Sequence, residues 1–560
     1  MPSVKSPKMT PAEATLMEGS GSFKDASQYE AVRDLLLRQE RSRAFDAEAL
    51  ENATNLELKA ADIVGQVRDD DQTKIYAPAR HRNGRQRYAG GPYLENLDLI
   101  NASRLLSIAQ HVPKGAHLHI HYNSGLPPRM LVEHARNIKA MWIRTSLPLT
   151  NEHNFRFAEV QFLVQQPPSK QGNIFAPNYV AMDWMQYQDF LRAYPGGVSA
   201  CEQWLVDRLT FTEEQTHGQR QTVTGSSIWD EFAINTRMIK GLFGYESAFR
   251  DYTRELIRSF VKDGIQYAEL RPNFPSNVLP RDDASANINN AALCQIIIDE
   301  VRAAKANLKP GQFFYGVKVI YCAPKLRPAA NMATNLNECI ALKQQFPNLI
   351  CGFDMVGPEE TMAPIHEYIP QLLEFRQRCN DLHLDIPFLL HAGETLQNGG
   401  QTDANLLDAL LLGCKRIGHG FALAQHPTLM ELFKKKNIAL EVCPIGNEIL
   451  HLCPTIGGHA LNTFLANDVH CTINCDNSIF YSSTLSHDFY QVMIGSTYQN
   501  LLGWKVLAKW SLEHSCLNEN ERAIVDGEWD AQWSAFLRWI IRNHPNEAAV
   551  WDRAHPGMRY

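Results

Sequence analysis

Eight apolar runs that alternate with helix-like stretches constrain the fold of this chain more than any other feature. Each run has the length and apolar content of a buried strand, and stretches with helical periodicity, such as AALCQIIIDEVRAAK, separate them. The first run is HLHIH at 117–121, and the other seven lie at 265–272, 315–322, 349–357, 386–394, 415–420, 437–444 and 469–477. Eight strands that alternate with helices are typical of a (β/α)8 barrel, the TIM-barrel form of the α/β class.

The remaining chain divides around this barrel. Its composition predicts a disordered polar tail, an N-terminal helical extension with a linker, a barrel with an insertion after its first strand, and C-terminal helices. These segments are 1–28 for the tail, 29–93 for the extension, 94–516 for the barrel, 123–225 for the insertion and 517–560 for the last helices. The insertion is rich in Pro, Gln and Asn, so we expect it to be irregular.

Charge and cysteine usage limit the partners and the compartment. The net charge is −7 and no stretch is strongly basic, which argues against nucleic acid and acidic membrane surfaces as partners. No stretch approaches the roughly 18 apolar residues of a membrane span, and the first residues lack the apolar run of a signal peptide. The twelve cysteines are scattered singly rather than arranged as a disulfide framework. We therefore expect a soluble, reduced, cytoplasmic protein.

The strand HLHIH places three histidines, His117, His119 and His121, on one face. At about 3.3 Å per residue, His117 and His121 lie roughly 13 Å apart. A zinc–nitrogen bond is only about 2.0–2.1 Å long, so one metal can bind at most two adjacent members. The two nearest the end of the strand are His119 and His121, and we expect His117 to pack or to form hydrogen bonds one layer deeper. Taken alone, the motif is a weak metal signal.

Polar residues also end three later strands. HAGE contains His391 and Glu394, RIGHG contains His419, and INCDN contains Asp476. Each has an ordinary structural alternative: a solvated turn for HAGE, a surface histidine for RIGHG and a helix cap for INCDN. Because the carboxyl ends of barrel strands meet at one face, their joint occurrence with HLHIH favours a shared site.

Three histidines and one carboxylate suit zinc, which acidifies a bound water toward neutrality. His419 and Glu394 are then the remaining titratable groups that can transfer protons at the barrel mouth. The residues by themselves indicate metal-assisted hydrolysis or hydrolytic deamination.

A set of ordered motifs resembles the adenosine deaminase family, and within it the adenosine deaminase-related growth factor branch. The motifs are PKGAHLHIH, ELRPNF, GFDMVGPEE, FLLHAGET, RIGHGFAL, EVCPIGN and INCDNSIF. The likeness covers roughly 94–516, and the N-terminal helical segment also resembles the extension of that branch. It implies a (β/α)8 barrel of the metal-dependent hydrolase type that converts adenosine or 2′-deoxyadenosine into inosine or deoxyinosine and ammonia.

The resemblance also implies roles for individual residues. One zinc ion per subunit would have four ligands: His119, His121, His391 and Asp476. His419 would orient and deprotonate the zinc water, and Glu394 would protonate N1 of the purine. Gly357 matches a position whose backbone meets the purine, and Trp229 falls where the branch has an aromatic residue near the nucleoside.

Two substrate-facing positions depart from the family pattern. The family has an acidic pair where this chain has Asp476 and Asn477, and an aspartate that meets the ribose where this chain has Asn123. An amide donates as well as accepts, so Asn477 can still bond purine N7, but it carries no charge. These departures leave two alternatives: a related aminohydrolase of adenine, AMP or a modified nucleoside, and a catalytically silent nucleoside-binding scaffold. The intact set of metal, acid and base residues argues against the scaffold.

The branch includes secreted, glycosylated members, but this chain shows no signal peptide. Its insertion holds a single cysteine, Cys201, so no disulfide can close within it. In that branch the N-terminal helices mediate dimerisation, so the resemblance implies a homodimer formed through these helices.

Overall fold

The computed structural model describes residues 23, 25–81, 83–218, 225–272, 274, 279–496 and 499–558. Most of the tail predicted at 1–28 lies outside the described residues. Its last residues already belong to helix α2 (Ala26–Ser42), which begins there because the Asp25 side chain accepts the Gln28 N–H at 2.9 Å as an N-cap.

The centre of the molecule is a closed barrel of eight parallel strands. One half contains β1 (Gly115–His121), β5 (Ile265–Arg271), β8 (Gly316–Pro324) and β9 (Ile350–Val356). The other half contains β10 (His391–Ala392), β11 (Arg416–His419), β12 (Ala439–Val442) and β13 (Cys471–Ile473). Parallel pairing of Phe353 with Phe388 and of Ile120 with Asp476 joins the halves at both seams. Each strand overlaps one of the eight apolar runs, and the predicted (β/α)8 barrel is confirmed.

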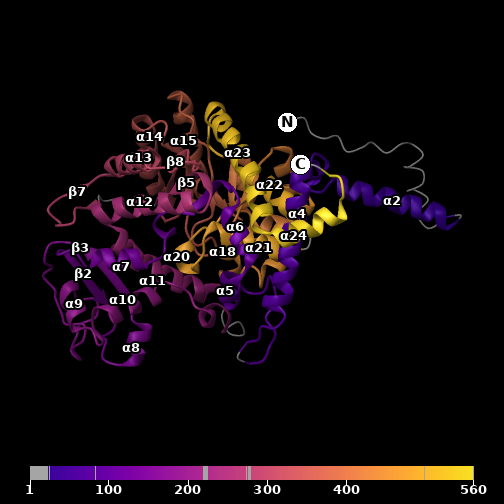
Figure 1. The fold of residues 1–560 in the computed structure, drawn as a ribbon. Coiled ribbons are helices and arrows are strands. Elements are labelled where there is room, and N and C mark those ends of the chain that lie inside the picture. The colour runs from indigo at the N-terminus through magenta and orange to yellow at the C-terminus, as the bar shows by residue number, and fades with distance from the viewer. Residues whose placement is uncertain are drawn as a thin grey trace.

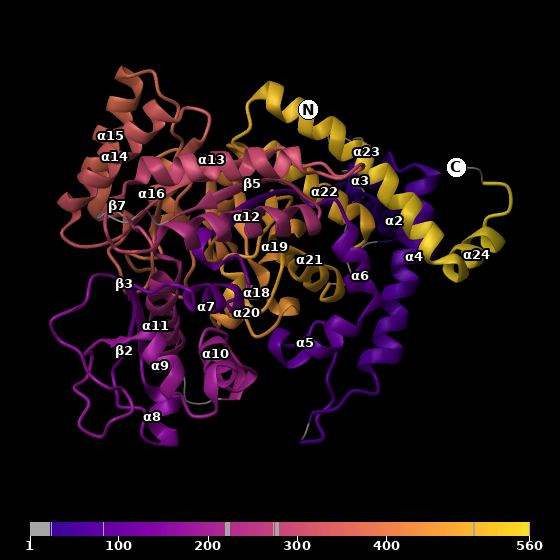
Figure 2. The same cartoon turned by 60° about the vertical axis from the view of Figure 1, so that its left-hand side comes forward.

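Helices that follow or flank the strands form the outer layer (Figures 1 and 2). They are α12 (Glu246–Lys262), α13 (Asn290–Ala306), α14 (Met332–Gln345), α15 (Ile369–Asp381), α16 (Asn405–Leu411), α17 (Pro427–Lys435), α19 (Leu461–Ala466), α21 (Leu485–Ile494) and α22 (Leu501–Glu513). Their apolar faces cover the strands, so the strands are buried on both sides and read as near-continuous apolar runs. All seven residues of β9 are buried.

Charged residues fill part of the barrel interior. Arg271 pairs with Asp354 at 2.8 Å and with Glu441 at 2.5 Å. Arg416 pairs with Glu441 at 2.7 Å and with Glu269 at 2.5 Å. All five side chains are fully buried, and such groups are tolerated only when they are paired in this way. This network lies directly beneath the metal-ligand candidates.

The N-terminal and C-terminal helices lie side by side at one flank of the barrel (Figures 1 and 2). Helix α4 (Asn55–Asp71) packs against α23 (Glu519–Asn543) and α24 (Pro545–Ala554), while α3 (Ala47–Glu51), α5 (Tyr93–Ala102) and α6 (Arg104–His111) complete the flank. The buried Glu57 carboxylate accepts from Trp533 at 2.9 Å and from Lys505 at 2.6 Å. Helix α2 instead projects away from the barrel, at the right of Figure 1, and buries only Val32.

The expectation that the insertion is irregular is wrong. It contains helices α7 (Arg129–Ala135), α8 (Glu152–Phe157), α9 (Tyr187–Ala193) and α10 (Gly197–Asp207) around a three-stranded antiparallel sheet. The strands β2 (Met141–Thr145), β3 (Val160–Val164) and β4 (Met185–Gln186) run in the order β3-β2-β4. They are too short to stand out from their Pro- and Gln-rich surroundings. Helix α11 (Gly225–Phe243) packs against β3 and returns the chain to the barrel.

Within the described residues, no helix combines the length and the apolar content needed to cross a bilayer.

Candidate active site

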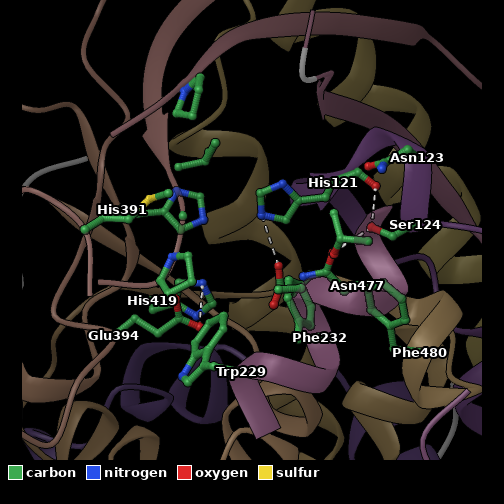
Figure 3. A pocket seen from close by; sticks show the side chains of 18 residues that line it. His121, Asn123, Ser124, Trp229, Phe232, His391, Glu394, His419, Asn477 and Phe480 are labelled. Atoms are coloured by element: carbon green, nitrogen blue, oxygen red, sulfur yellow. Dashed lines mark hydrogen bonds and ion pairs between the residues drawn. The ribbon is translucent and has the colours of Figure 1, made fainter. Parts of the chain in front are cut away.

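The four predicted metal ligands lie together at the mouth of the barrel. His119 and His121 come from β1, His391 begins β10, and Asp476 follows β13. The ligand nitrogens of the three histidines lie within 4.8 Å of one another. One carboxylate oxygen of Asp476 is 3.6 Å from Nε2 of His119 and 3.3 Å from Nε2 of His121. Figure 3 shows His121 and His391 facing each other across this point.

Two atoms of this group lack partners that buried polar atoms normally have. Nε2 of His119 and Oδ1 of Asp476 are buried without a hydrogen bond, although they face the same point. Burial lowers the pKa of His121 to about 3 and holds that of His119 well below its usual range, so both rings are neutral at pH 7. Neutral imidazole is the form that binds metal. A divalent cation such as zinc therefore fits these residues.

Two buried carboxylates orient the imidazoles from behind. Nδ1 of His119 lies 2.8 Å from Glu441, and Nδ1 of His391 lies 2.8 Å from Asp354. Burial opposes ionisation of Asp354, but His391 and Arg271 hold the pKa of its carboxyl below the usual range. Each carboxylate thus accepts the Nδ1 proton and leaves Nε2 free toward the shared point, as is common at metal sites.

The backbone at Asp476 adopts a strained conformation that places its side chain beside the metal-ligand histidines. Its φ is +58°, a left-handed conformation that costs energy for a residue with a side chain. Hydrogen bonds to β1 maintain it, because Asp476 N–H donates to the His119 carbonyl at 3.2 Å and His121 N–H donates to the Asp476 carbonyl at 3.1 Å. The barrel seam therefore holds Asp476 beside the two histidines.

His117 lies outside this group, one layer below it. Its Nε2 accepts the Cys475 N–H at 3.2 Å, and its ring is fully buried. Burial lowers the pKa of His117 to about 3. His117 therefore forms a buried hydrogen bond to the segment after β13 that carries Asp476.

Glu394 and His419 face each other beside the metal-ligand group (Figure 3), with Nε2 of His419 3.4 Å from the Glu394 carboxyl. The turn that carries Glu394 is held by Glu359, which accepts the N–H of Gly393 at 3.0 Å and of Glu394 at 2.6 Å. Burial, with Asp476 and Glu359 nearby, raises the pKa of Glu394 well above its usual value. Glu394 therefore keeps its proton to higher pH than an ordinary glutamic acid.

A chain of three side chains fixes the tautomer of His419. Leu461 N–H donates to Nδ1 of His459 at 2.9 Å, and burial lowers the pKa of His459 to about 3, so the neutral ring carries its proton on Nε2. That proton is donated to the Asn447 oxygen at 3.1 Å, which leaves the Asn447 amide nitrogen to donate to Nδ1 of His419 at 3.1 Å. Neutral His419 therefore carries its proton on Nε2, directed at Glu394 and the cavity.

A cavity of about 260 Å³ opens above these groups, close to the lower end of the ~300–1,000 Å³ range of small-molecule pockets. The four predicted substrate-facing residues all line it: Gly357, Asn477, Asn123 and Trp229. Gly357 has a φ of +121°, which a residue with a side chain rarely adopts, so the backbone can turn there beside a ligand. Figure 3 shows Asn123, Asn477 and Trp229 around the opening.

Helix α11 supplies one wall of the cavity. Of this wall, only Trp229 was predicted from the sequence. Trp229, Phe232, Ala233 and Thr236 all line the cavity, and their spacing of three, four and seven residues places them on one helical face. Phe480 packs edge-on against Phe232 at 4.9 Å between ring centres. These aromatic side chains form an apolar surface on which a flat heterocycle can stack.

Ser124 sets the orientation of Asn477, as Figure 3 shows. Its hydroxyl donates to Oδ1 of Asn477 at 2.6 Å. The oxygen of the amide is therefore engaged, and the NH2 group, which also faces Asp476 and Tyr481, is the part that can donate to a ligand.

Several functional residues were missed by the sequence reasoning. Asp354 and Glu441 had a usable signal, because each is a lone acid inside an otherwise apolar strand. Asn447 and His459 had none, since their connection to His419 joins three separate segments of the chain that meet only in the fold.

Comparison with known proteins agrees with this geometry. Residues 210–530, more than half of the chain, match the family model described as adenosine deaminase. An adenosine deaminase of Phlebotomus duboscqi is 29% identical over 487 residues, covering 86% of this chain and 85% of the relative. Adenosine deaminase 2 of Homo sapiens is 28% identical over 496 residues, covering 88% of each chain. The solved structure of the Arabidopsis N6-mAMP deaminase covers 76% of this chain and 99% of its own with a TM-score of 0.52, and at 13% identity it supports the fold alone.

Proposed function

The chain belongs to the adenosine deaminase family, and from this premise we propose that it hydrolyses the 6-amino group of adenosine and 2′-deoxyadenosine. The products are inosine or deoxyinosine and ammonia. The observation that carries the proposal is the joint position of three imidazoles, one carboxylate, the acid Glu394 and an oriented His419 at the base of one apolar cavity. This arrangement supplies the parts that a hydrolytic deamination needs.

The family is metal-dependent, and the proposed metal is one zinc ion per subunit. The proposed ligands are His119, His121, His391 and Asp476. When bound, zinc activates water for attack on the purine. The neutral imidazoles, the carboxylates behind them and the unpartnered Oδ1 of Asp476 support this assignment.

Glu394 is the proposed acid for purine N1. Its raised pKa favours the protonated carboxyl, and a proton placed on N1 draws electrons from C6, where water attacks. The hydrogen bonds from Gly393 and Glu394 N–H to Glu359 hold the turn that carries Glu394 in place before substrate arrives. A fixed donor loses little entropy at the moment of transfer.

His419 is proposed to orient the attacking water. The Nε2–H that Asn447 and His459 impose can donate to the oxygen of the water and direct its lone pair at C6. Deprotonation of the water by the same nitrogen requires the other tautomer, and therefore a rotation of the Asn447 amide. Orientation is thus the primary role that we assign, and deprotonation is conditional on that rotation.

The purine and the sugar are proposed to occupy opposite ends of the cavity. The Asn477 NH2 group donates to N7, the Gly357 backbone meets the purine, and Trp229 packs against the nucleoside. Asn123 lies at the sugar end, because N9 of the purine points away from C6. The apolar wall of α11 favours the flat ring, and the NH2 group of Asn477, whose oxygen accepts from Ser124, matches the lone pair of N7.

A different 6-aminopurine substrate is the second candidate. It is motivated by the amides at Asn123 and Asn477 and by the fold of the N6-mAMP deaminase. A phosphate would need a cationic partner, and the side chains that line the described cavity include no Lys or Arg. This observation favours nucleosides over nucleotides.

A parallel assay of purified protein with adenosine, 2′-deoxyadenosine, adenine and AMP tests the proposal. Ultraviolet absorbance follows loss of the 6-amino group. We expect both nucleosides to be consumed and AMP to be left. Consumption of AMP or adenine in preference to adenosine would reject adenosine as the substrate but would leave the proposed hydrolytic deamination intact.

We also propose a homodimer that forms through the N-terminal extension at 29–93, as in the growth factor branch. Helix α2 exposes Tyr29, Leu36 and Leu37 while burying little of its own surface, which supports a partner for this helix. We propose the cytoplasm as the compartment, because all twelve cysteines are free thiols.

A further inference from the structure

Two cysteines meet at the base of the barrel, at the end opposite the metal-ligand group. Cys351 lies near the start of β9, and Cys516 follows α22. Their sulfur atoms are no more than 4.8 Å apart. Cys516 packs with Cys351 against a small apolar cluster of Ile320, Cys322, Val356 and Leu389.

The two thiols have different surroundings. Cys351 is buried, whereas Cys516 is partly exposed and lies 3.6 Å from Nη1 of Arg416. The neighbouring Cys351 thiol lowers the pKa of Cys516; burial and Glu269 oppose this shift, and Arg416 and Lys415 support it. Burial raises the pKa of Cys351 well above its usual value. Thiolate character, a neighbouring cation and solvent access are the features of an oxidation-sensitive cysteine.

A metal ion is a poor occupant for this place, although Glu269 lies within 4.8 Å of both sulfur atoms. The Glu269 carboxylate is already paired with Arg416 at 2.5 Å and accepts the Cys516 N–H at 2.5 Å. A cation would also meet the guanidinium of Arg416 directly. The same positive charge instead favours a thiolate.

We propose that Cys516 and Cys351 are a thiol pair that hydroperoxide oxidises to an intramolecular disulfide at the base of the barrel. The Cys516 thiolate attacks one peroxide oxygen, the O–O bond breaks, and the sulfur becomes a sulfenic acid while the leaving oxygen takes up a proton. The sulfur of Cys351 then attacks the sulfenic sulfur, its proton goes to the departing hydroxyl, and water leaves. Two thiols are oxidised by two electrons and the peroxide is reduced. Closure needs rotation of the side chains, because a disulfide bond is about 2.05 Å long.

A chain of contacts connects the pair to the proposed metal site. Arg416 contacts Cys516 at 3.6 Å and Glu441 at 2.7 Å, and Glu441 contacts Nδ1 of His119 at 2.8 Å. Oxidation removes the negative sulfur that faces Arg416, and so changes the surroundings of the carboxylate that orients His119. We therefore expect peroxide to lower deaminase activity reversibly, and this clause alone rests on the proposed function.

The test uses the full-length, reduced, metal-loaded chain and hydrogen peroxide at increasing ratios. Free thiols are then alkylated, and unreduced peptides are analysed by mass spectrometry. We expect a peptide that joins 351 to 516, the loss of two titratable thiols, and full reversal by dithiothreitol. In Cys351→Ser the oxidation should stop at a dimedone-reactive sulfenic acid on Cys516.

Cys414→Ser is the matched control, because burial raises the pKa of the Cys414 thiol to about 12 and the residue lies outside the pair. It should form the linked peptide as the unaltered chain does. Absence of the linked peptide from the unaltered chain would overturn the proposal, and so would a Cys516 thiol that stays unoxidised in Cys351→Ser under the same peroxide treatment. A linked peptide with unchanged activity and zinc content would overturn only the connection to the metal site. Loss of adenosine turnover before any peroxide is added would count against the proposed function and not against the thiol pair.

Discussion

Replacing His117 with leucine tests whether this buried histidine has a structural role distinct from the two proposed ligands, His119 and His121. The change removes the acceptor of the Cys475 N–H, which stays buried, and an unsatisfied buried donor costs about 1–3 kcal/mol. We expect the free energy of unfolding at pH 7 to fall by about that amount. Zinc content should stay at one ion per chain, because Nε2 of His117 is engaged one layer below the ligand group.

The pH dependence of the same variant provides a sharper test. The folded-state pKa of His117 is about 3 and the unfolded value is about 6.5, so below pH 6.5 the unfolded chain binds the extra proton and folding loses stability as pH falls. At pH 5 this loss is about 2 kcal/mol for one such histidine. Leucine does not titrate, so the stability gap between the two proteins should shrink by about 2 kcal/mol between pH 7 and pH 5.

Urea unfolding followed by tryptophan fluorescence at both pH values measures this difference. His121 and His459 also stay neutral in the fold, but they titrate alike in both proteins and cancel. Parallel stability profiles for the two proteins would refute the buried, neutral state assigned to His117. Loss of zinc from His117→Leu would refute the strand geometry that separates it from the ligands.

Four further changes test separate parts of the site and the assembly. Asn447→Leu should lower kcat about 10–100-fold and change its pH profile, because His419 loses the partner that sets its tautomer. An unchanged pH profile in steady-state assays would reject the role assigned to the hydrogen bonds from His459 through Asn447 to His419. Glu394→Gln should lower kcat/KM by roughly 10²–10⁴ while zinc, measured by elemental analysis, is retained. In the unaltered enzyme, kcat/KM should decline as pH rises through the raised pKa of Glu394, since only the protonated form donates to N1; a rise over that range would exclude Glu394 as the acid. Leu36→Glu combined with Leu37→Glu should convert the proposed dimer to a monomer in light scattering, whereas Leu411→Glu, a change of a still more exposed leucine on α16, should leave the dimer intact.

The barrel was predictable from sequence because its strands are buried on both faces. Each therefore appears as a continuous apolar run, such as ICGFDMV in β9, bounded by polar residues. The same property made the ligand candidates visible, since His391, His419 and Asp476 interrupt or end such runs. Strand rise alone was enough to separate His117 from His121.

The insertion and the cavity wall were less accessible to sequence reasoning. The strands β2 and β3 are only five residues long, and their alternation is lost among Pro, Gln and Asn residues. Helix α11 contributes Phe232 and Thr236 to the cavity, but its position over the barrel mouth depends on packing against β3. Periodicity identifies a helix and its apolar face, and it does not identify what that face covers.

The polar residues that orient the site residues were likewise only partly predictable from sequence. Glu441 and Asp354 were detectable as isolated acids within apolar strands, where a charge needs a partner. Ser124 and Asn447 were not, because each acts on a residue more than 25 positions away in the chain. Ser124 orients Asn477, and Asn447 orients His419. Both contacts become visible only when these distant segments are placed in space.

Zinc content and adenosine turnover, measured together on the same purified chain, test the central claim most directly. We expect about one zinc ion per chain, loss of turnover when a chelator removes it, and recovery when one equivalent of zinc is returned. His119→Ala should lack both zinc and activity while remaining folded. Full turnover of adenosine by chelated, zinc-free protein would contradict the account, and so would retention of zinc by His119→Ala.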